Sequence, residues 1–461
     1  MALGFSSDAL LVALGLLVAS LAPAAVPRVN VVVLLADDQR FDTIRALGNT
    51  EIRTPHLDQL AREGFAFTHA FLMGSGQPAV CVPSRAMLMT GRTLFRATAR
   101  FTNGLIPRLA PTLPSTLREA GYTTYLVGKW HNDKPSLVRS FSGGGPIFFG
   151  GMADHTRMRV QAFDSSGVYA QTNERIATKF SSELFADAAI DILRRHSRAT
   201  PFFLYVAFTA PHDPRTPPKE TAELYRPEAI RLPKNFQPEH PFDNGELKIR
   251  DEKLLPWPRT PEAVQKEIAA YYGMITHLDG QIGRILRVLE ETGRARDTLV
   301  VFAGDNGLAV GQHGLLGKQN LYEHSIRVPL VLRGPGIPRG ERSDALVYLF
   351  DVFPTVCGLT GVAVPATVEG KSLEPILRGR QQRVRDTVFA AYRNVQRMVR
   401  DERWKLIWYP TIERVQLFDL SSDPLEMRDL SGDRRYAARA AALKGRLAEM
   451  QARLDDTLSF K

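Results

Sequence analysis

The chain has 461 residues, of which 44% are hydrophobic and 23% are charged, and its formal net charge is +10 at pH 7. This length allows a large core and more than one domain, and the composition is that of a globular enzyme rather than of a disordered or fibrous protein. The positive charge favours anionic partners such as sulfated glycans, nucleic acid or a membrane surface. The basic residues are scattered, however, and no nucleic-acid-binding motif is evident, so we expect no nucleic-acid partner.

An apolar segment spans residues 9–22 and ends at Ala22-Pro23-Ala24, a small-residue pattern typical of signal-peptide cleavage sites. We therefore predict a signal peptide over 1–24 and a periplasmic or secreted protein. The segment before the apolar run departs from the usual pattern, because it has no Lys or Arg and carries Asp8. An uncleaved anchor is the alternative, but the apolar run is short for a membrane span, so we expect no stable membrane insertion.

Apolar runs rich in β-branched residues alternate with helical patterns along most of the chain. The predicted strands are 30–36, 122–127, 202–208, 298–303 and 328–332, and the predicted helices are 54–63, 112–120, 181–195 and 260–291. Strands without polar alternation are typical of sheets covered on both faces, which are mainly parallel. The pattern predicts an α/β domain, a large mainly parallel sheet flanked by helices, over 25–365. Residues 132–180 and 213–260 are predicted to be long insertions that contribute to substrate selectivity.

The pattern of apolar residues changes near residue 365. Short strand-like runs at 388–392, 397–399, 404–409 and 415–419 predict a smaller antiparallel sheet, and a helix at 436–454 is expected to pack on it. We assign 366–461 to a C-terminal α+β subdomain. Cys357 lies in an apolar stretch and is predicted to be a core residue; Cys81 is the only other cysteine, so no disulfide is expected.

Four of the predicted strands end in charged or metal-binding residues. These residues are Asp37 and Asp38, Lys129 and His131, His212, and Asp305 and Asn306. Because ligands bind beyond the carboxyl ends of parallel strands, one shared pocket is expected. The oxygens of Asp37, Asp38, Asp305 and Asn306 are hard ligands that select Ca²⁺ or Mg²⁺ over zinc or copper. Asp37-Asp38 alone, or Asp305-Asn306 alone, would more often be an ordinary turn, and only the presence of both pairs at strand ends favours a metal site.

The segment 77–92, which contains Cys81, Pro83, Arg85 and Gly91, is the most distinctive in the chain. Pro83 is a favoured first helical residue, and Gly91 is a stop. One helical turn separates Cys81 from Arg85, so the sulfur and the guanidinium share a side, and the helix N-terminus favours an anion there. On spacing alone, a nucleophile beside an oxyanion site and an ordinary loop cysteine are equally good interpretations.

The run from Cys81 to Arg85, with Thr90 and Gly91, resembles the C-x-P-S-R-x(4)-T-G motif of the type I sulfatases, which belong to the alkaline-phosphatase-like superfamily. Bacterial polysaccharide sulfatases are the most similar group. The resemblance also includes Gly128-Lys129-Trp130-His131, Ala-Pro-His212 and the segment 313–318, which ends in Lys318. It covers most of 28–335 and, more weakly, 385–430. At 132–133, Asn-Asp replaces the family's usual Leu-Gly, which leaves the local turn open.

The resemblance implies a chemistry for each matching residue. In this family the cysteine at position 81 is converted to formylglycine, whose hydrate attacks the sulfur of a sulfate ester and then expels sulfate from the hemiacetal. The implied metal ligands are Asp37, Asp38, Asp305, Asn306 and the formylglycine oxygen at Cys81. Arg85 favours the deprotonated oxygen, Lys129 and Lys318 hold the sulfate, His212 protonates the leaving group and His131 accepts a proton. His313 and His324 are expected to be structural or to lie outside the immediate site.

The implied protein is a sulfatase that acts on sulfated carbohydrates and depends on a formylglycine-generating enzyme or a sulfatase-maturing enzyme. A phosphonate monoester or phosphodiester hydrolase is the nearest alternative, because such enzymes can share the fold and the formylglycine. A two-zinc alkaline phosphatase fits less well, since Asn306 rather than His follows Asp305, and Cys81 replaces Ser or Thr. A catalytically inactive glycan-binding protein would require missing catalytic residues, and none is missing.

Overall fold

The computed structural model describes Met1 and residues 29–101 and 103–458. Residues 2–24 of the predicted signal peptide therefore lie outside the described residues. Within the described residues, no helix combines the length and the apolar character needed to cross a membrane.

A nine-stranded sheet forms the centre of the molecule, in the order β11-β2-β10-β9-β1-β8-β4-β5, with β12 also paired to β2. Its strands are β1 (Asn30–Ala36), β2 (Phe65–Phe71), β4 (Thr123–Lys129), β5 (Gly143–Phe148), β8 (Phe202–Ala207), β9 (Thr298–Gly304), β10 (Arg327–Arg333), β11 (Glu341–Ser343) and β12 (Val347–Tyr348). All pairings are parallel except those of β10 with β9 and β2. The predicted mainly parallel α/β sheet is confirmed. The apolar run at 328–332 correctly indicated a strand buried on both faces, but β10 is antiparallel to its neighbours. An apolar composition does not indicate the direction of a strand.

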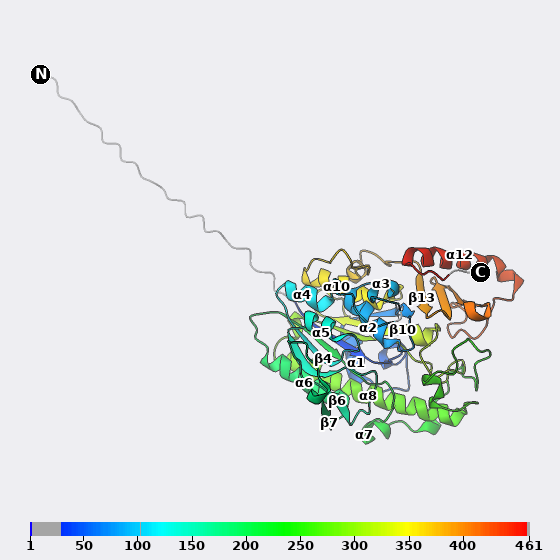
Figure 1. The fold of residues 1–461 in the computed structure, drawn as a ribbon, viewed down its shortest axis with the longest axis horizontal. Helices are drawn as coiled ribbons and strands as arrows, with labels where there is room; N and C mark the ends of the chain where they lie inside the picture. The colour runs from blue at the N-terminus through cyan, green and yellow to red at the C-terminus, as the bar shows by residue number, and fades with distance from the viewer. Residues whose placement is uncertain (2–28, 102, 459–461) are drawn as a thin grey trace.

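Helices cover both faces of this sheet (Figure 1). They are α1 (Pro55–Glu63), α2 (Cys81–Thr90), α4 (Leu113–Glu119), α5 (Lys134–Ser140), α6 (Ser181–Arg195), α8 (Pro261–Glu291) and α10 (Val352–Thr360). Alternate residues of β1 enter two different cores, because successive strand residues face opposite ways. Val31 and Val33 pack in the core that includes α2, α4 and α10, whereas Val32 and Leu34 pack in the core with α1, α6 and α8. This two-sided burial explains the absence of polar alternation.

The predicted helices agree closely with the structure. α6 has the predicted bounds, and three helices begin one residue later than predicted, because Thr54, Thr112 and Thr260 are N-caps. Thr112 and Thr260 each accept a hydrogen bond from the first helical turn, the usual capping role of threonine. Cys357 is fully buried, as predicted.

The segment 132–180 is more than an insertion. It supplies α5 and then β5, which is the edge strand of the central sheet, followed by the hairpin of β6 (Met158–Val160) and β7 (Arg175–Ala177). The segment 213–260 contains only α7 (Lys219–Ala222) and short 3₁₀ turns. The glycine-rich start of β5 concealed its strand character, since glycine is depleted in strands.

A second, five-stranded sheet has the order β16-β15-β14-β13-β3. Its strands are β3 (Gly74–Ser75), β13 (Val388–Tyr392), β14 (Gln396–Arg400), β15 (Trp404–Tyr409) and β16 (Arg414–Asp419). β13 to β16 are antiparallel, as predicted, and α12 (Ala437–Leu454) contacts β14 and β15. The unpredicted member is β3, which pairs in parallel with β13 just before the Cys81 segment. The division of the chain at residue 365 stays a prediction.

Candidate active site

Helix α2 presents Cys81 at its first turn. The helix begins at Cys81, so the predicted start at Pro83 is wrong by two residues. It ends at Thr90 and is capped by Gly91, whose φ of 63° is the left-handed conformation that glycine favours. Pro83 still lies in the first turn, where a missing N–H costs no helical hydrogen bond. All residues of α2 are buried, and Cys81 is only 2% exposed.

The carboxyl ends of neighbouring strands bring the other predicted residues to Cys81. Asp37 and Asp38 follow β1, Asp305 and Asn306 follow β9, and Lys129 is the last residue of β4. Because β9, β1, β8 and β4 are adjacent and parallel, these ends meet at one edge of the sheet. The sulfur of Cys81 and carboxylate oxygens of Asp37 and Asp305 lie within 4.8 Å of one another.

The two adjacent aspartates reach the same cluster because the strand has ended. Asp38 has a φ of 69°, which turns its side chain out of the strand alternation. Lys129 Nζ lies 2.6 Å from Asp37 Oδ2, and Lys318 Nζ lies 2.6 Å from Asp38 Oδ1. The amide nitrogen of Asn306 also donates to Asp38 Oδ1 at 2.7 Å. Each aspartate therefore has its own lysine.

Arg85 is fully buried and links the carboxylates. Its Nε donates to Asp305 Oδ2 at 3.0 Å, its Nη1 donates to the Lys129 carbonyl at 3.0 Å, and its Nη2 lies 3.6 Å from Asp37 Oδ1. Burial alone would raise the pKa of Asp37, but Lys129 and Arg85 hold it well below its ordinary value. Burial and the charge of Asp37 raise the pKa of Asp305 to about 7, against the opposing effect of Arg85.

The oxygen atoms of this cluster fit a hard divalent cation. Asp37 Oδ1, Asp38 Oδ2 and Asn306 Oδ1 are buried and have no hydrogen-bond partner among the described residues. Buried polar atoms are nearly always paired, so three unpaired oxygens in one cluster indicate a missing ligand. Ca²⁺ and Mg²⁺ take such carboxylate and amide oxygens. Asp38, His212 and Asp213 also have metal-ligand spacing, but Arg250 already pairs the Asp213 carboxylate.

His131 and Lys129 flank the sulfur of Cys81. His131 Nδ1 lies 3.3 Å and Lys129 Nζ 3.8 Å from Sγ. They do not lie on one extended face of the strand, because β4 ends at Lys129 and His131 has a φ of 59°. Burial raises the pKa of the Cys81 thiol despite Lys129 and Lys318. Burial, Lys129 and Arg85 lower the pKa of His131 to about 2, which keeps the imidazole neutral.

His212 is held by partners that the sequence analysis did not assign to the site. Its Nδ1 lies 2.8 Å from the Asp213 carbonyl and 3.3 Å from Asp213 Oδ1, and its Nε2 lies 3.7 Å from Asp38 Oδ2. Arg250 Nη1 donates to Asp213 Oδ1 at 3.0 Å, and His155 Nε2 lies 3.0 Å from the His212 carbonyl. Burial would raise the pKa of Asp213, but Arg250 and His212 hold it below its ordinary value. Arg250 and His155 come from the two segments predicted as insertions, and neither has a local sequence signal.

The second sheet supports the segment that carries Lys318. Gln396 of β14 accepts a hydrogen bond from the Leu321 backbone at 3.1 Å. Glu323 lies 2.7 Å from Arg400 of β14 and 3.1 Å from Lys405 of β15. These contacts hold residues 321 and 323 against the second sheet, which therefore helps to position Lys318, three residues before Leu321.

His313 and His324 lie behind this segment. The ring of His313 stacks on Tyr322 with centroids 4.1 Å apart, and its Nε2 lies 3.0 Å from the Leu425 carbonyl. His324 Nδ1 lies 2.8 Å from the hydroxyl of Ser325. These contacts agree with the expectation that neither histidine belongs to the immediate site.

Comparisons with known proteins identify what the chain resembles. The family model described as Sulfatase matches residues 29–362, and the model described as N-sulphoglucosamine sulphohydrolase, C-terminal, matches residues 311–453. The chain is 27% identical to an arylsulfatase of Clostridium perfringens, over 90% of this chain and 92% of that protein. It is 26% identical to an N-acetylglucosamine-6-O-sulfatase of Bacteroides thetaiotaomicron, over 93% of this chain and 87% of that protein.

Solved structures share the fold. A protein solved in complex with its substrate D-glucosamine-2-N,6-O-disulfate superposes with a TM-score of 0.78 at 23% identity, over 93% of this chain and 99% of that chain. A phosphonate monoester hydrolase of Agrobacterium radiobacter superposes with a TM-score of 0.75 at 23% identity, over 93% and 96% of the two chains. At these identities the likeness shows the fold and does not separate the two activities.

Proposed function

Because this chain belongs to the sulfatase family of the alkaline-phosphatase-like superfamily, we propose that it hydrolyses sulfate esters of carbohydrates through a formylglycine formed from Cys81. One observation carries the proposal. Cys81 lies at the first turn of a buried helix, within 4.8 Å of the carboxylates of Asp37 and Asp305 on two strand ends. Lys129 and Arg85 pair with these carboxylates, and Lys318 pairs with the neighbouring Asp38. The sulfur of Cys81 stands in the structure for the formylglycine oxygen.

The metal site proposed here consists of Asp37, Asp38, Asp305, Asn306 and the oxygen at position 81, holding Ca²⁺ or Mg²⁺. When bound, the ion would supply positive charge beside the sulfate oxygens. The three aspartates and the three cations Arg85, Lys129 and Lys318 cancel in charge. A divalent ion would therefore leave the cluster with a net charge of about +2, which favours a singly charged sulfate ester and then the deprotonated nucleophile.

We assign the remaining roles, sulfate binding and proton transfer, from the positions of the lysine and histidine side chains. Lys129 and Lys318, which pair with Asp37 and Asp38, would hold sulfate oxygens. His131, whose Nδ1 lies 3.3 Å from the sulfur, is placed to accept the proton when the hemiacetal expels sulfate. His212, whose Nδ1 faces Asp213 and whose Nε2 faces the cluster, is suited to give a proton to the departing alkoxide.

The substrate class is proposed from two observations. The relative from Bacteroides is named for action on N-acetylglucosamine 6-O-sulfate, and the chain has a net charge of +10, which suits a polyanionic glycan. The predicted signal peptide adds the proposal that the enzyme is exported. Formation of formylglycine requires a formylglycine-generating enzyme or a sulfatase-maturing enzyme as a partner. We also propose that 366–461 is a subdomain that supports the catalytic part.

The first experiment is mass spectrometry of the peptide that contains Cys81, from protein made in its native host. Replacement of the CH₂SH group by CHO would support the mechanism, whereas unmodified Cys81 in an active preparation would exclude it. Paired assays on aryl sulfate and aryl phosphonate esters then test the second candidate. That candidate is favoured by the fold shared with phosphonate monoester hydrolases, and a higher kcat/KM for the phosphonate would establish it.

A further inference from the structure

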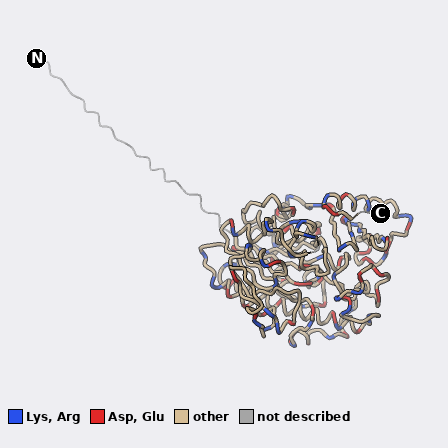
Figure 2. Tube along the Cα trace, viewed as in Figure 1, with Lys and Arg blue, Asp and Glu red and all other residues tan. Residues whose placement is uncertain are grey.

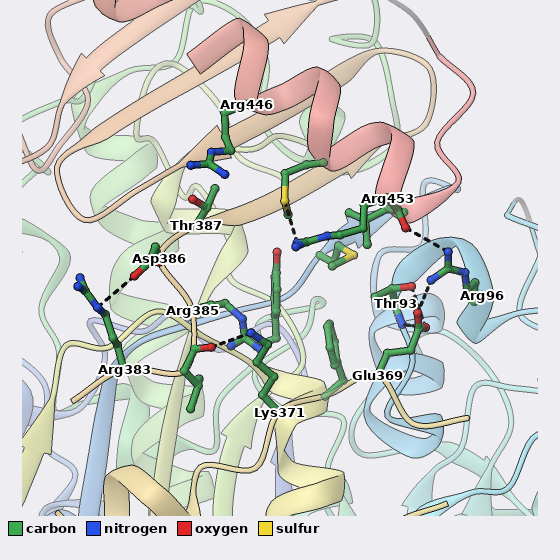
Figure 3. Close-up of a pocket in the computed structure, with 16 residues that line it drawn as sticks. Thr93, Arg96, Glu369, Lys371, Arg383, Arg385, Asp386, Thr387, Arg446 and Arg453 are labelled. Atoms are coloured by element: carbon green, nitrogen blue, oxygen red, sulfur yellow. Dashed lines mark hydrogen bonds and ion pairs between the residues drawn. The ribbon is translucent and has the colours of Figure 1, made fainter. Parts of the chain in front are cut away.

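A second cavity lies away from the Cys81 cluster. It has a volume of about 560 Å³ and lies between α12, the segment 383–387 before β13, and the chain that follows α2 (Figure 3). Its lining includes Thr93, three residues beyond the end of α2, whereas Cys81 begins that helix. Ten helical residues span about 15 Å, and none of the proposed catalytic or metal-binding residues lines the cavity. The cavity is therefore separate from the catalytic centre.

Cations dominate the polar part of this lining. Figure 3 shows Arg446 and Arg453 reaching in from α12 and facing Arg383 and Lys371 across the opening. The six lining cations are Arg96, Lys371, Arg383, Arg385, Arg446 and Arg453, and the two lining carboxylates are Glu369 and Asp386. Elsewhere on the chain, lysine and arginine are interspersed with acidic residues (Figure 2). A concentration of cations around a hollow favours an anionic ligand.

Two of these cations are already neutralised. Arg385 donates to the buried carboxylate of Asp351 at 2.8 Å. Arg96 pairs with Glu369 and with Asp455, at the side of the cavity nearest α3 (Leu94–Ala97). Arg385 and Arg96 therefore have a structural role in the cavity lining, and we do not assign them to ligand binding.

The other four cations are free to bind. Among the described residues, Lys371 and Arg453 form no ion pair; Lys371 donates to the Val384 carbonyl at 2.8 Å, and Arg453 contacts the sulfur of Met450 at 2.9 Å. Arg383 and Arg446 pair only with acidic residues whose side chains are more than half exposed. Such surface pairs contribute little and exchange readily for a better partner. Arginine is suited to hold sulfate or carboxylate groups through two parallel hydrogen bonds.

The rest of the lining consists of Thr93, Thr387 and an apolar group. Met73, Tyr348, Phe350, Val384, Met450 and Leu454 form it. A lining that combines apolar side chains with charged groups suits a sugar ring that carries an anionic substituent, because the ring offers C–H groups and the substituent offers oxygens. We propose that this cavity binds a sulfate- or carboxylate-bearing saccharide unit of a polyanionic glycan, as a site distinct from the catalytic centre. The choice of a glycan rests on the proposed function; the choice of an anion rests on the cavity alone.

Binding at this second site would raise the local concentration of a polymeric substrate without taking part in catalysis. The test uses the full chain with Cys81→Ala, so that no turnover occurs. The test variant adds Lys371→Gln, Arg446→Gln and Arg453→Gln. A matched control instead adds Arg194→Gln, Lys219→Gln and Arg226→Gln, which remove the same charge at exposed positions of α6, α7 and the chain after α7. Circular dichroism establishes that both fold.

Calorimetry would measure binding of a heparin octasaccharide, inorganic sulfate and neutral dextran. We expect the dissociation constant for the octasaccharide to rise at least tenfold in the test variant and less than twofold in the control. Equal affinity in all three proteins would overturn the proposal. Saturation of the cavity by inorganic sulfate alone, with no added affinity for the octasaccharide, would overturn its assignment to a glycan.

A second measurement separates this inference from the proposed function. With Cys81 intact, the test variant should hydrolyse a small aryl sulfate as well as the wild type does, and its KM for a sulfated polymer should rise. If the wild type hydrolyses no sulfate ester but octasaccharide binding still depends on the cavity residues, the proposed function fails and the site stands. If hydrolysis is normal and binding is unaffected by the three substitutions, the site fails alone.

Discussion

Substitution of Arg85 by methionine measures how strongly one buried cation stabilises the site. Arg85 is fully buried, and its Nε and Nη2 lie 3.0 and 2.9 Å from the same oxygen of Asp305. Methionine fills much of the same space but offers no donor, so Asp305 would keep a buried charge without its nearest counter-ion. Removing one partner of a buried ion pair costs about 3–5 kcal/mol, a large part of the 5–15 kcal/mol that typically stabilises a folded domain.

The effect should depend on pH. The pKa of Asp305 is already raised to about 7 by burial and Asp37, and Arg85 opposes this rise, so its loss would raise the pKa further. When a carboxyl group has a higher pKa in the folded state than in the unfolded state, the folded protein loses stability as the pH rises from the unfolded-state pKa to the folded-state pKa. Arg85→Met should therefore be more destabilising at pH 8.5 than at pH 6.

The assay is urea unfolding followed by tryptophan fluorescence, in the presence of a chelator, at both pH values. Arg194→Met is the matched control, because Arg194 forms an exposed pair with Glu291 at 3.5 Å, and it should change stability by less than about 1 kcal/mol. If Arg85→Met were no more destabilising than Arg194→Met, the guanidinium would not be compensating the carboxylates. Activity on an aryl sulfate should also fall by about 10²–10³, the loss typical of one donor to a developing charge.

Three further predictions concern the metal, the leaving group and acid stability. Chelation should abolish sulfate ester hydrolysis and lower the melting temperature, and Ca²⁺ or Mg²⁺ should restore both; full activity after exhaustive chelation would contradict the metal site built on Asp37 and Asp38. Asp213→Asn should lower kcat for an alkyl sulfate far more than for a nitrophenyl sulfate, up to about 10²-fold, because only the poorer leaving group needs protonation by His212; equal losses would count against this role. Burial lowers the pKa of His240 and His313 to about 4. Between pH 6.5 and 4 these two histidines are therefore protonated in the unfolded chain but not in the folded one, and each histidine should lower the stability of the fold by about 3 kcal/mol as the pH falls through this range. Urea midpoints that stay constant over this range would disprove it.

Much of the fold was predictable because the local patterns are strong. The run 30–36 is apolar throughout, and both of its faces prove to be covered by helices. Apolar residues at helical spacing placed α8 within one residue. β5 and β3 were missed for a physical reason: they contain glycine or only two residues, and non-local pairing rather than intrinsic propensity makes them strands.

The candidate site also contains residues that the sequence predicted and residues that it did not. Residues at strand ends and in the Cys81 motif could be named, because topology alone brings strand ends together. Asp213, Arg250 and His155 could not be assigned to the site, since their position depends on how two long segments fold over the sheet. The left-handed backbone of Asp38 and His131 was likewise invisible, because it is imposed by the contacts that the side chains make at the end of the strand.

The pairing of β3 with β13 has a consequence for the order of events in the life of the chain. Residues 74 and 75 hydrogen-bond beside residues 391 and 392, so the entrance to the Cys81 segment is closed by a strand synthesised more than 300 residues later. This pairing can form only after residues 391 and 392 have been synthesised, so the segment 77–92 gains its support from the second sheet late. Afterwards Cys81 is 2% exposed. On the proposed function, conversion of Cys81 to formylglycine would therefore have to precede completion of the C-terminal sheet, or the sheet would have to open again to admit the modifying enzyme.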